Sequence, residues 1–260
     1  MRTLLTLGAG VVSLCHLVVD VAASPSFDLS YETGPAYVVQ NDGKYGSEGT
    51  PFEAEEVGQQ DNLSRSQRAS VEVRSGRHRV VALYAPFQLD TRVSLARSLT
   101  FRDEEFPMGT VVDHRYRFNG YRASYLYEVV SGSLRVEIGG SLQVRDADVA
   151  FASVDGTRAA NQSDIGFVPA LKGRVTYAPG KAWGALEIDG LSTFGLVGDT
   201  SGGIYDAALI AGYPLRDDVH LFANLRLLGG GAEVPDQQID NWANFVSASL
   251  GLRFRVATGG

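Results

Sequence analysis

The sequence has almost no cysteine and, after its first residues, no long apolar run. Cys15 is the single cysteine among 260 residues, and it lies in an apolar N-terminal stretch. The rest of the chain therefore cannot form a disulfide framework or a structural zinc–thiolate site. Beyond residue 23, no segment approaches the roughly 18 consecutive apolar residues of a transmembrane helix. These absences exclude a disulfide-rich domain and a protein that crosses a membrane with helices.

The chain also lacks the charge balance and the motifs of several common functions. Its formal net charge is −7 at pH 7, so a nucleic acid partner is not expected. It has no HExxH motif and no Ser–His–Asp order. Gly229 to Gly231 end a predicted strand, whereas a phosphate-binding loop would open a helix. We therefore expect neither a cofactor nor a metal site.

The first 23 residues have the organisation of a secretory signal. Arg2 supplies a positive charge, residues 4–19 form an apolar core, and small residues end the stretch at Ala23. A lipoprotein signal is disfavoured because Leu14 precedes Cys15 where a small residue is needed. The stretch predicts export through a cleaved N-terminal signal, followed by one domain over residues 24–260.

Apolar and polar residues alternate along both halves of residues 115–148, which are separated by turn-forming residues at 130–133. Tyr121, Tyr125 and Tyr127 share one face of the first half with smaller apolar residues. A period of two over two arms of about fifteen residues predicts a β-hairpin. Arms of this length exceed the usual strand of about five or six residues. They suit strands that cross a bilayer at a steep tilt.

The same alternation along the chain predicts an all-β fold, an antiparallel up-and-down transmembrane β-barrel of about 10 strands, with 8–12 strands possible. The predicted strands are residues 27–39, 66–75, 78–91, 115–130, 133–149, 163–178, 182–194, 203–213, 219–231 and 242–256. Short connections alternate with longer ones at residues 40–65, 91–114, 150–162, 195–202 and 232–241. Outer-membrane barrels have this asymmetry, with short periplasmic turns and long external loops.

Two tryptophans bear on this interpretation. Trp183 and Trp242 stand at strand starts, where the aromatic girdles of a membrane barrel would lie. A soluble β-sandwich or a lipocalin-like barrel would show the same alternation, with the apolar face toward a core. The long strands, the one-sided loops, the signal and the lack of cysteine favour the membrane barrel.

Four phrases of the sequence carry a family resemblance. They are LYAPF at residues 83–87, YRFNGYRASYLYEV at 116–129, VRDADVAF at 144–151 and SDIGFVPAL at 163–171. Together they resemble an uncharacterised family of bacterial outer-membrane β-barrel proteins, over residues 80–254. The resemblance implies a location in the outer membrane of a Gram-negative bacterium and a barrel fold, and it implies no activity.

If the apolar face of each strand meets lipid, the polar face lines the lumen. The side chains predicted to line it are Arg122, Glu128, Arg135, Glu137, Arg145, Lys172, Arg174, Glu187, Asp189, Asp206, Arg226 and Arg253. A barrel of this size has a narrow interior that side chains tend to fill. Because an isolated buried charge is costly, opposite charges there should pair. The pattern thus predicts a largely occluded lumen, with a narrow pore for small polar solutes as the alternative.

One set of residues allows a catalytic hypothesis. Asp113 and His114 lie near the external end of one predicted strand, and Asp146 and Asp148 near that of its neighbour. Carboxylates beside a histidine could activate water, as in an outer-membrane protease or a lipid A-modifying hydrolase. However, adjacent residues of a strand point to opposite faces, which disfavours an Asp113–His114 dyad. Acidic residues at a barrel rim are more often solvated, or bridged by cations to lipopolysaccharide.

The sequence therefore predicts a non-enzymatic barrel with a structural or surface-interaction role. Its expected partners are outer-membrane lipid and lipopolysaccharide, with a small polar solute possible. A narrow passive pore and a hydrolase at the external rim stay open as alternatives. The sequence does not determine the oligomeric state.

Overall fold

The computed structural model describes residues 25–192 and 201–257, so the predicted signal peptide lies outside the described residues. No helix within those ranges is both long and apolar enough to cross a membrane. The strands are β1 (Ser26–Tyr45), β2 (Ser64–Ser75), β3 (His78–Ala85), β4 (Gln88–Ser94), β5 (Leu99–Phe101), β6 (Glu104–Phe106), β7 (Val111–Val130), β8 (Leu134–Ser153), β9 (Ala159–Tyr177), β10 (Trp183–Ser192), β11 (Ser201–Pro214), β12 (Val219–Val234) and β13 (Ile239–Ala257), with one 3-10 turn, η1 (Pro235–Gln237), before the last.

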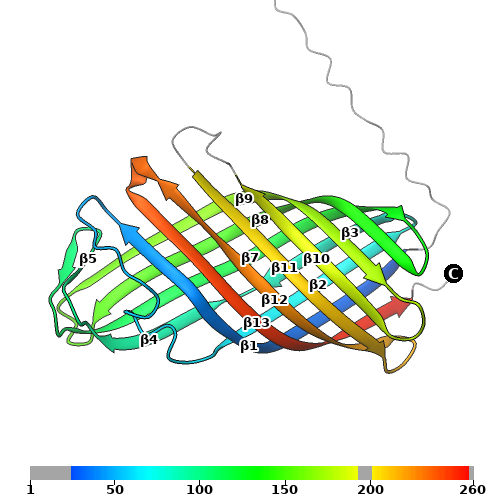
Figure 1. Ribbon diagram of the computed structural model, residues 1–260, viewed down its shortest axis with the longest axis horizontal. Coiled ribbons are helices and arrows are strands. Elements are labelled where there is room, and N and C mark those ends of the chain that lie inside the picture. Colours follow the sequence, from blue (N-terminus) through cyan, green and yellow to red (C-terminus); the bar gives the residue numbers. More distant parts are fainter. Residues whose placement is uncertain (1–24, 193–200, 258–260) are drawn as a thin grey trace, which may run out of the picture.

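The strands close into a ring (Figure 1). Each wall strand pairs antiparallel with the next along the chain, and β1 pairs with β13 to complete the circle. β3 and β4 both pair with β7 and act as one barrel strand interrupted at Pro86 and Phe87. The wall therefore has ten strands, which confirms the predicted antiparallel up-and-down barrel. The hairpin β5–β6 forms a separate sheet inside a loop and adds nothing to this number.

The connections distinguish the two ends of the barrel. The turn end carries the tight connections, such as those at Gly76 and Gly132, whose φ angles of 55° and 124° suit glycine. Both ends of the described chain also lie there, because Ser26 stands opposite Ala257. The loop end carries residues 46–63 and 95–110 between wall strands.

Several strands extend further toward the loop end than the sequence predicted. β7 begins at Val111, β8 continues to Ser153, and β13 begins at Ile239. As a result, two of the connections predicted to be long are short: residues 154–158 and 235–238 join their strands. The prediction failed there because apolar and polar residues still alternate, but near the loop end the apolar residues face the interior and the polar residues face outward.

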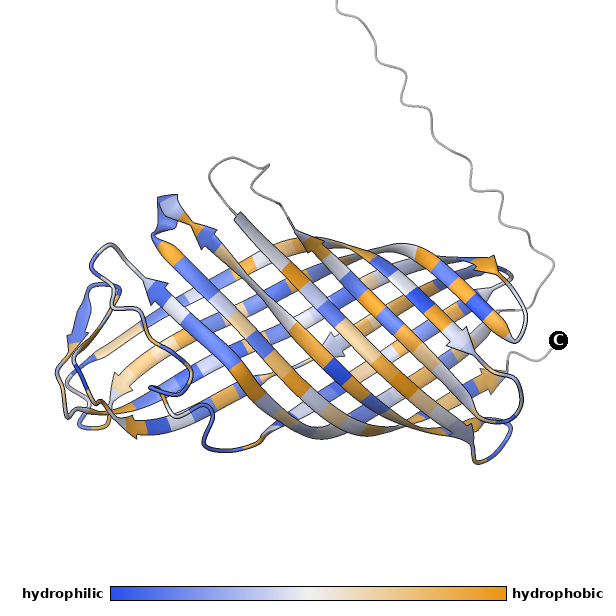
Figure 2. Ribbon diagram, in the orientation of Figure 1, coloured by the Kyte–Doolittle hydropathy of each residue, from blue (hydrophilic) through white to orange (hydrophobic). Residues whose placement is uncertain are grey.

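This exchange of faces divides the barrel into two halves. In the turn-end half, large apolar side chains point outward, as Tyr121, Leu142 and Phe167 do, and charged side chains point inward. Toward the loop end of β7 the faces are reversed, because Val112 and Tyr116 are buried inside whereas Asp113 and Arg115 are exposed. Figure 2 shows apolar and polar residues alternating along the wall strands.

Candidate functional site

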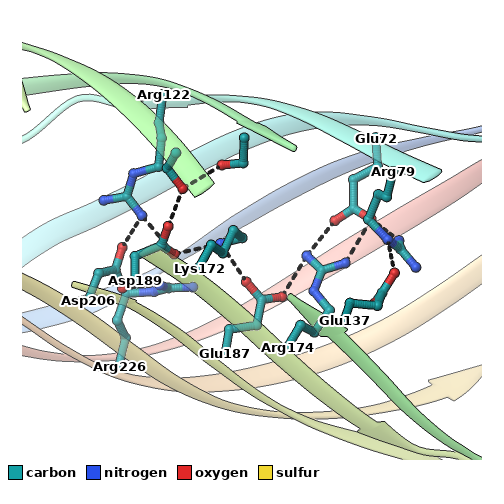
Figure 3. Close-up of polar contacts among 12 residues, drawn as sticks. Glu72, Arg79, Arg122, Glu137, Lys172, Arg174, Glu187, Asp189, Asp206 and Arg226 are labelled. Carbon is teal, nitrogen blue, oxygen red and sulfur yellow. Dashed lines mark hydrogen bonds and ion pairs between the residues drawn. The ribbon is translucent and has the colours of Figure 1, made fainter. Parts of the chain in front are cut away.

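The turn-end half of the interior is filled by ionised side chains (Figure 3). Of the residues predicted to line the lumen, eight belong to one connected set of ion pairs: Arg122, Glu137, Lys172, Arg174, Glu187, Asp189, Asp206 and Arg226. The set is completed by Glu32, Arg68, Glu72 and Arg79. We call these twelve residues the ionic network.

Asp206 on β11 is the centre of one end of the ionic network. Its carboxylate is almost completely buried and contacts three guanidinium groups. Arg122 Nη1 lies 3.0 Å from Oδ2 and Arg68 Nη2 lies 3.4 Å from it, while Arg226 pairs with Oδ1. Arg122 also donates two hydrogen bonds to Gln143 Oε1. Buried charge is tolerated here because each group has partners of opposite sign.

The ionic network then alternates in sign toward the turn end. Lys172 Nζ lies 2.5 Å from Asp189 Oδ2 and 3.5 Å from Glu187 Oε2. Glu187 also pairs with Arg174 at 2.8 Å, and Arg174 reaches Glu72 at 2.9 Å. The partners come from strands on opposite sides of the ring, β2, β9 and β10. These contacts bridge the interior and fill it with side chains.

Four members of the ionic network were missed by the sequence prediction. Glu32 lies on β1, and Arg68, Glu72 and Arg79 lie on β2 and β3. The signal was present, because Glu32 alternates with Tyr31 and Thr33 in the same way as the residues that were named. The same use of parity, extended to the first strands, would have found Glu32, Arg68 and Glu72, but both faces of the segment around Arg79 are apolar.

The remaining predicted lumen residues lie apart from the ionic network. Glu128 pairs with Arg135 at 3.1 Å near the turn end, and Arg145 pairs with Asp164 on the inner face. Arg253 stacks over the ring of Trp183, 4.9 Å from its centroid. Trp183 also packs against a small buried apolar cluster, so its predicted place in an outward aromatic girdle is wrong.

The loop-end half of the interior is filled differently, by apolar side chains from two loops. We call this cluster the apolar plug. Its buried members from residues 45–63 and 95–110 are Tyr45, Phe52, Ala54, Val57, Leu95, Leu99, Phe101 and Phe106. They pack on inward residues of the wall, among them Phe151, which has no exposed surface and contacts the rings of Phe52 and Phe101.

Polar contacts fix the apolar plug to the wall. Gln59 accepts a hydrogen bond from Asn41 at 2.8 Å and lies 2.8 Å from His114 Nε2. His114 Nδ1 lies 3.1 Å from the carbonyl oxygen of Ala150. A neutral His114 with its proton on Nδ1 can donate to Ala150 and accept from Gln59. Thr91 donates to the carbonyl of Val57 at 2.7 Å. These side chains hold residues 54–59 against β1, β4 and β7.

An ion pair joins the two loops at the loop end. Arg97 donates from Nε and Nη2 to the two carboxylate oxygens of Glu56, both at 2.8 Å, and also to the carbonyl of Pro51. The hydrogen bonds from Arg97 lower the pKa of Glu56 below its ordinary value of 4.5. Because the pKa is lowered in the folded state, the pair stabilises the loops fully at pH values above the ordinary pKa of 4.5. This stabilisation is lost as the pH falls through the lowered pKa.

We expect Arg97→Ala to raise the pKa of Glu56 back toward its ordinary value of 4.5. The measurement is a pH titration of the Glu56 carboxyl carbon by nuclear magnetic resonance on the refolded barrel. Arg92→Ala is the matched control, because Arg92 pairs with Asp113 instead. An unchanged pKa in Arg97→Ala would show that the two loops are not joined by this pair.

The catalytic candidates are not brought together. Asp113 lies on the outer face of β7, where it pairs with Arg92 at 2.6 Å, while His114 is buried on the inner face within the apolar plug. Asp146 and Asp148 lie on the outer face of β8, opposite Asn119 and Arg117. Asp146 accepts from both of these residues.

A shallow hollow of about 700 Å³ lies over this part of the outer face. Asp90, Arg92, Asp113 and Arg115 lie along it with small residues such as Ala152. The acids are paired with arginines, as in the 3.3 Å contact between Arg115 and Asp90. Within residues 25–192 and 201–257, no three His, Cys, Asp or Glu side chains are grouped to hold a metal ion.

The outer face decides the kind of barrel. Large apolar side chains cover the turn-end half on every side, and several are mostly exposed, such as Ile165, Phe167, Leu171, Leu225 and Leu250. A water-soluble protein rarely exposes a continuous apolar surface of this extent, whereas a transmembrane barrel presents such a band to lipid. The chain has the architecture of an outer-membrane β-barrel. A soluble β-sandwich or lipocalin-like barrel would place the apolar face of each strand inside along its whole length. The inward charges and outward apolar side chains of the turn-end half rule out that arrangement.

No family model and no curated protein sequence matches the chain. Among solved structures it is similar to the outer membrane protease OmpT of Escherichia coli, with 10% sequence identity, a TM-score of 0.48, and coverage of 89% of this chain and 97% of that one. It is also similar to the attachment invasion locus protein Ail of Yersinia pestis, with 12% sequence identity, a TM-score of 0.38, and coverage of 88% of this chain and 99% of that one. A third similar structure is the toluene transporter TodX of Pseudomonas putida, with 9% sequence identity, a TM-score of 0.39, and coverage of 90% of this chain and 91% of that one.

Proposed function

We propose that the protein is an outer-membrane β-barrel of a Gram-negative bacterium that is closed at rest and has a structural or surface-interaction role. The observation that supports this most strongly is the filled interior. The ionic network occupies the turn-end half, and the apolar plug occupies the loop-end half. A solute would have to displace both in succession, so the lumen is occluded and its charged residues brace the wall.

The remaining parts of the proposal follow from the two surfaces. The apolar band meets the acyl chains of the outer membrane, and the polar outer face beyond it meets lipopolysaccharide headgroups. Export depends on the N-terminal signal. A hydrolase at the external rim is less well supported, because Asp113 and His114 point to opposite sides of the wall and Asp146 is engaged by Arg117 and Asn119.

We expect the refolded wild-type protein to produce no conductance steps in a planar lipid bilayer. Folding is checked first by the different gel mobility of boiled and unboiled samples. Replacing residues 96–109 with two glycines removes part of the apolar plug, and Glu72→Ala with Arg174→Ala interrupts the ionic network. Because the two obstructions lie in series, neither change alone should give steps, while the combined variant should.

The control is Asp113→Asn, which alters an exposed charge and should stay silent even when combined with the loop replacement. Reproducible steps from the wild type would contradict the proposal and establish the narrow passive pore instead. Silence from a folded combined variant would also contradict it, since the two fillings would then not be what closes the lumen.

A further inference from the structure

The barrel wall is interrupted between β2 and the combined strand β3–β4. Pairing of β2 with β3 ends where Ala69 stands opposite Tyr84, although β2 continues to Ser64. Beyond that point β4 pairs with β7 alone among the described strands. Pro86, which lacks a backbone N–H, follows directly after β3 and cannot extend the ladder. A gap therefore separates residues 64–68 from the start of β4.

The inward-facing residues beside the gap are not fully covered. On the two strands that flank it, Ser66 and Leu83 face inward and are nevertheless partly exposed. At a similar height, inward residues of β1 and β8 such as Ala36 and Gln143 are buried, while Val168 on β9 is partly exposed. Ser66 has no partner on β3 or β4, whereas Leu83 lies just below the gap and still stands opposite Ser70.

The gap lies where the outer face changes from apolar to polar. Tyr84 and Tyr121 stack at 4.9 Å between ring centroids just below it, and both are exposed on the apolar band. Just above it, Gln88 stands opposite Arg117 on the polar part of the outer face. In a bilayer this height corresponds to the boundary between acyl chains and headgroups, where tyrosines of membrane barrels gather.

A cavity lies behind the gap, between the apolar plug and the ionic network. Its volume is about 50 Å³, room for roughly three or four water molecules. One side of the cavity is apolar and the other is cationic. Gln67 on one flank of the gap and Pro86 on the other both line the cavity. The apolar side consists of Phe87, Phe118, Leu228 and Phe245, and the cationic side of Arg68, Arg122 and Arg226.

On the cationic side three arginines outnumber the nearest carboxylates, although the ionic network as a whole has six cations and six carboxylates. Arg68 and Arg226 share Glu32 and Asp206, and Arg122 shares Asp206 as well. The next carboxylate, Asp189, lies 3.1 Å from Arg122 but is also held by Lys172 at 2.5 Å.

A hydrogen-bond donor is left over on the same side. Arg226 has a side chain that is only 8% exposed, and its buried Nε has no hydrogen-bond partner among the described residues. A buried donor without a partner is costly, and this one belongs to a side chain that lines the cationic side of the cavity.

We propose that this gap is a lateral entrance for a single-chain anionic amphiphile from the outer leaflet. Its carboxylate enters the cavity and pairs with Arg226 and Arg68. Its chain stays in the gap beside Phe87, because the cavity is large enough for a headgroup only. The site is independent of conduction through the lumen, since the ionic network below it remains closed.

The test uses protein refolded in phosphatidylcholine vesicles and a ten-carbon carboxylic acid that carries a photoreactive diazirine next to its carboxyl group. After illumination, mass spectrometry locates the labelled residues. We expect labelling of the peptides that contain Phe87 and Phe118. Unlabelled decanoate should compete at least tenfold better than decanol or decylamine of the same chain length, because only decanoate carries the matching charge. Acetate should compete weakly, because it does not concentrate at the membrane surface.

The matched variants are Ser66→Trp, which fills the gap from its inward face, and Arg65→Trp, which places the same ring on the outer face. Labelling should fall at least tenfold in the first and persist in the second. Equal labelling of both variants, labels confined to Tyr84 and Tyr121, or equal competition by decanol would overturn the proposal. Acetate as effective as decanoate would overturn the lateral route. If Ser66→Trp does not fold, the competition series on the wild type decides alone.

Discussion

Asp206→Asn is expected to lower the free energy of unfolding by about 3–5 kcal/mol, the usual cost of removing one partner from a buried ion pair. The substitution preserves the shape of the side chain and removes its charge. Arg68, Arg122 and Arg226 then lose the carboxylate that all three contact. Of their other carboxylate partners, Asp189 is already engaged by Lys172. The uncompensated positive charge stays largely buried, because the three arginine side chains are only 6–11% exposed.

The measurement is urea unfolding of the protein in lipid vesicles, followed by tryptophan fluorescence. Asp113→Asn is the matched control, because it removes a carboxylate from an ion pair with Arg92 that is exposed on both sides. Exposed pairs contribute little to stability, so this variant should unfold like the wild type. Equal midpoints for Asp206→Asn and Asp113→Asn would show that the ionic network does not stabilise the barrel.

Phe151→Ala is expected to loosen the apolar plug without unfolding the barrel. Removing a fully buried phenylalanine ring costs about 3–5 kcal/mol, because a cavity is left behind. The ring of Phe151 contacts those of Phe52, Phe101, Phe106 and His114, the last at 4.2 Å between centroids. Its loss therefore weakens the attachment of both loops to the wall at once.

Hydrogen exchange measured by mass spectrometry resolves this local effect. Amides in residues 54–59 and 99–106 should lose about two to four powers of ten in protection, since opening of a region follows its local free energy. Phe167→Ala is the control, because Phe167 is 71% exposed on the outer face and touches no part of the apolar plug. Unchanged protection in Phe151→Ala would contradict the packing described for the loops.

Much of the wall could be predicted because a strand that separates lipid from a polar interior must alternate at every residue. The segment from Tyr121 to Val129 follows this rule except at Leu126, which faces inward and is buried. The ten strands were recovered, with an error of six residues at the loop end of β1. The part that escaped prediction begins where lipid ends. From Val112 to Phe118 the alternation persists, but Asp113, Arg115 and Arg117 face outward. One parity rule applied to the whole strand therefore gives the wrong interior.

The interior could be predicted only where strands supply both partners of a contact. Arg122 and Asp206 were named because each lies on a regular strand, although their pairing across the ring required the closed barrel. Phe52 and Phe101 lie in loops without any period, so nothing in the sequence indicated that they turn inward. The gap at Pro86 was also missed, because alternation through residues 78–91 conceals a missing neighbour.

The pairing of β1 with β13 has a consequence for how the ring is assembled. Every other wall contact joins strands that follow one another along the chain, so hairpins can add in order as local events. The last contact must bring together Ser26 and Ala257, and joining chain ends so far apart costs about 5 kcal/mol in loop-closure entropy. The register offsets this cost by running the whole length of both strands, from Ser26 opposite Ala257 to Tyr45 opposite Ile239. A curved but unjoined sheet is therefore the natural intermediate, and its two free edges are the strands at either end of the chain.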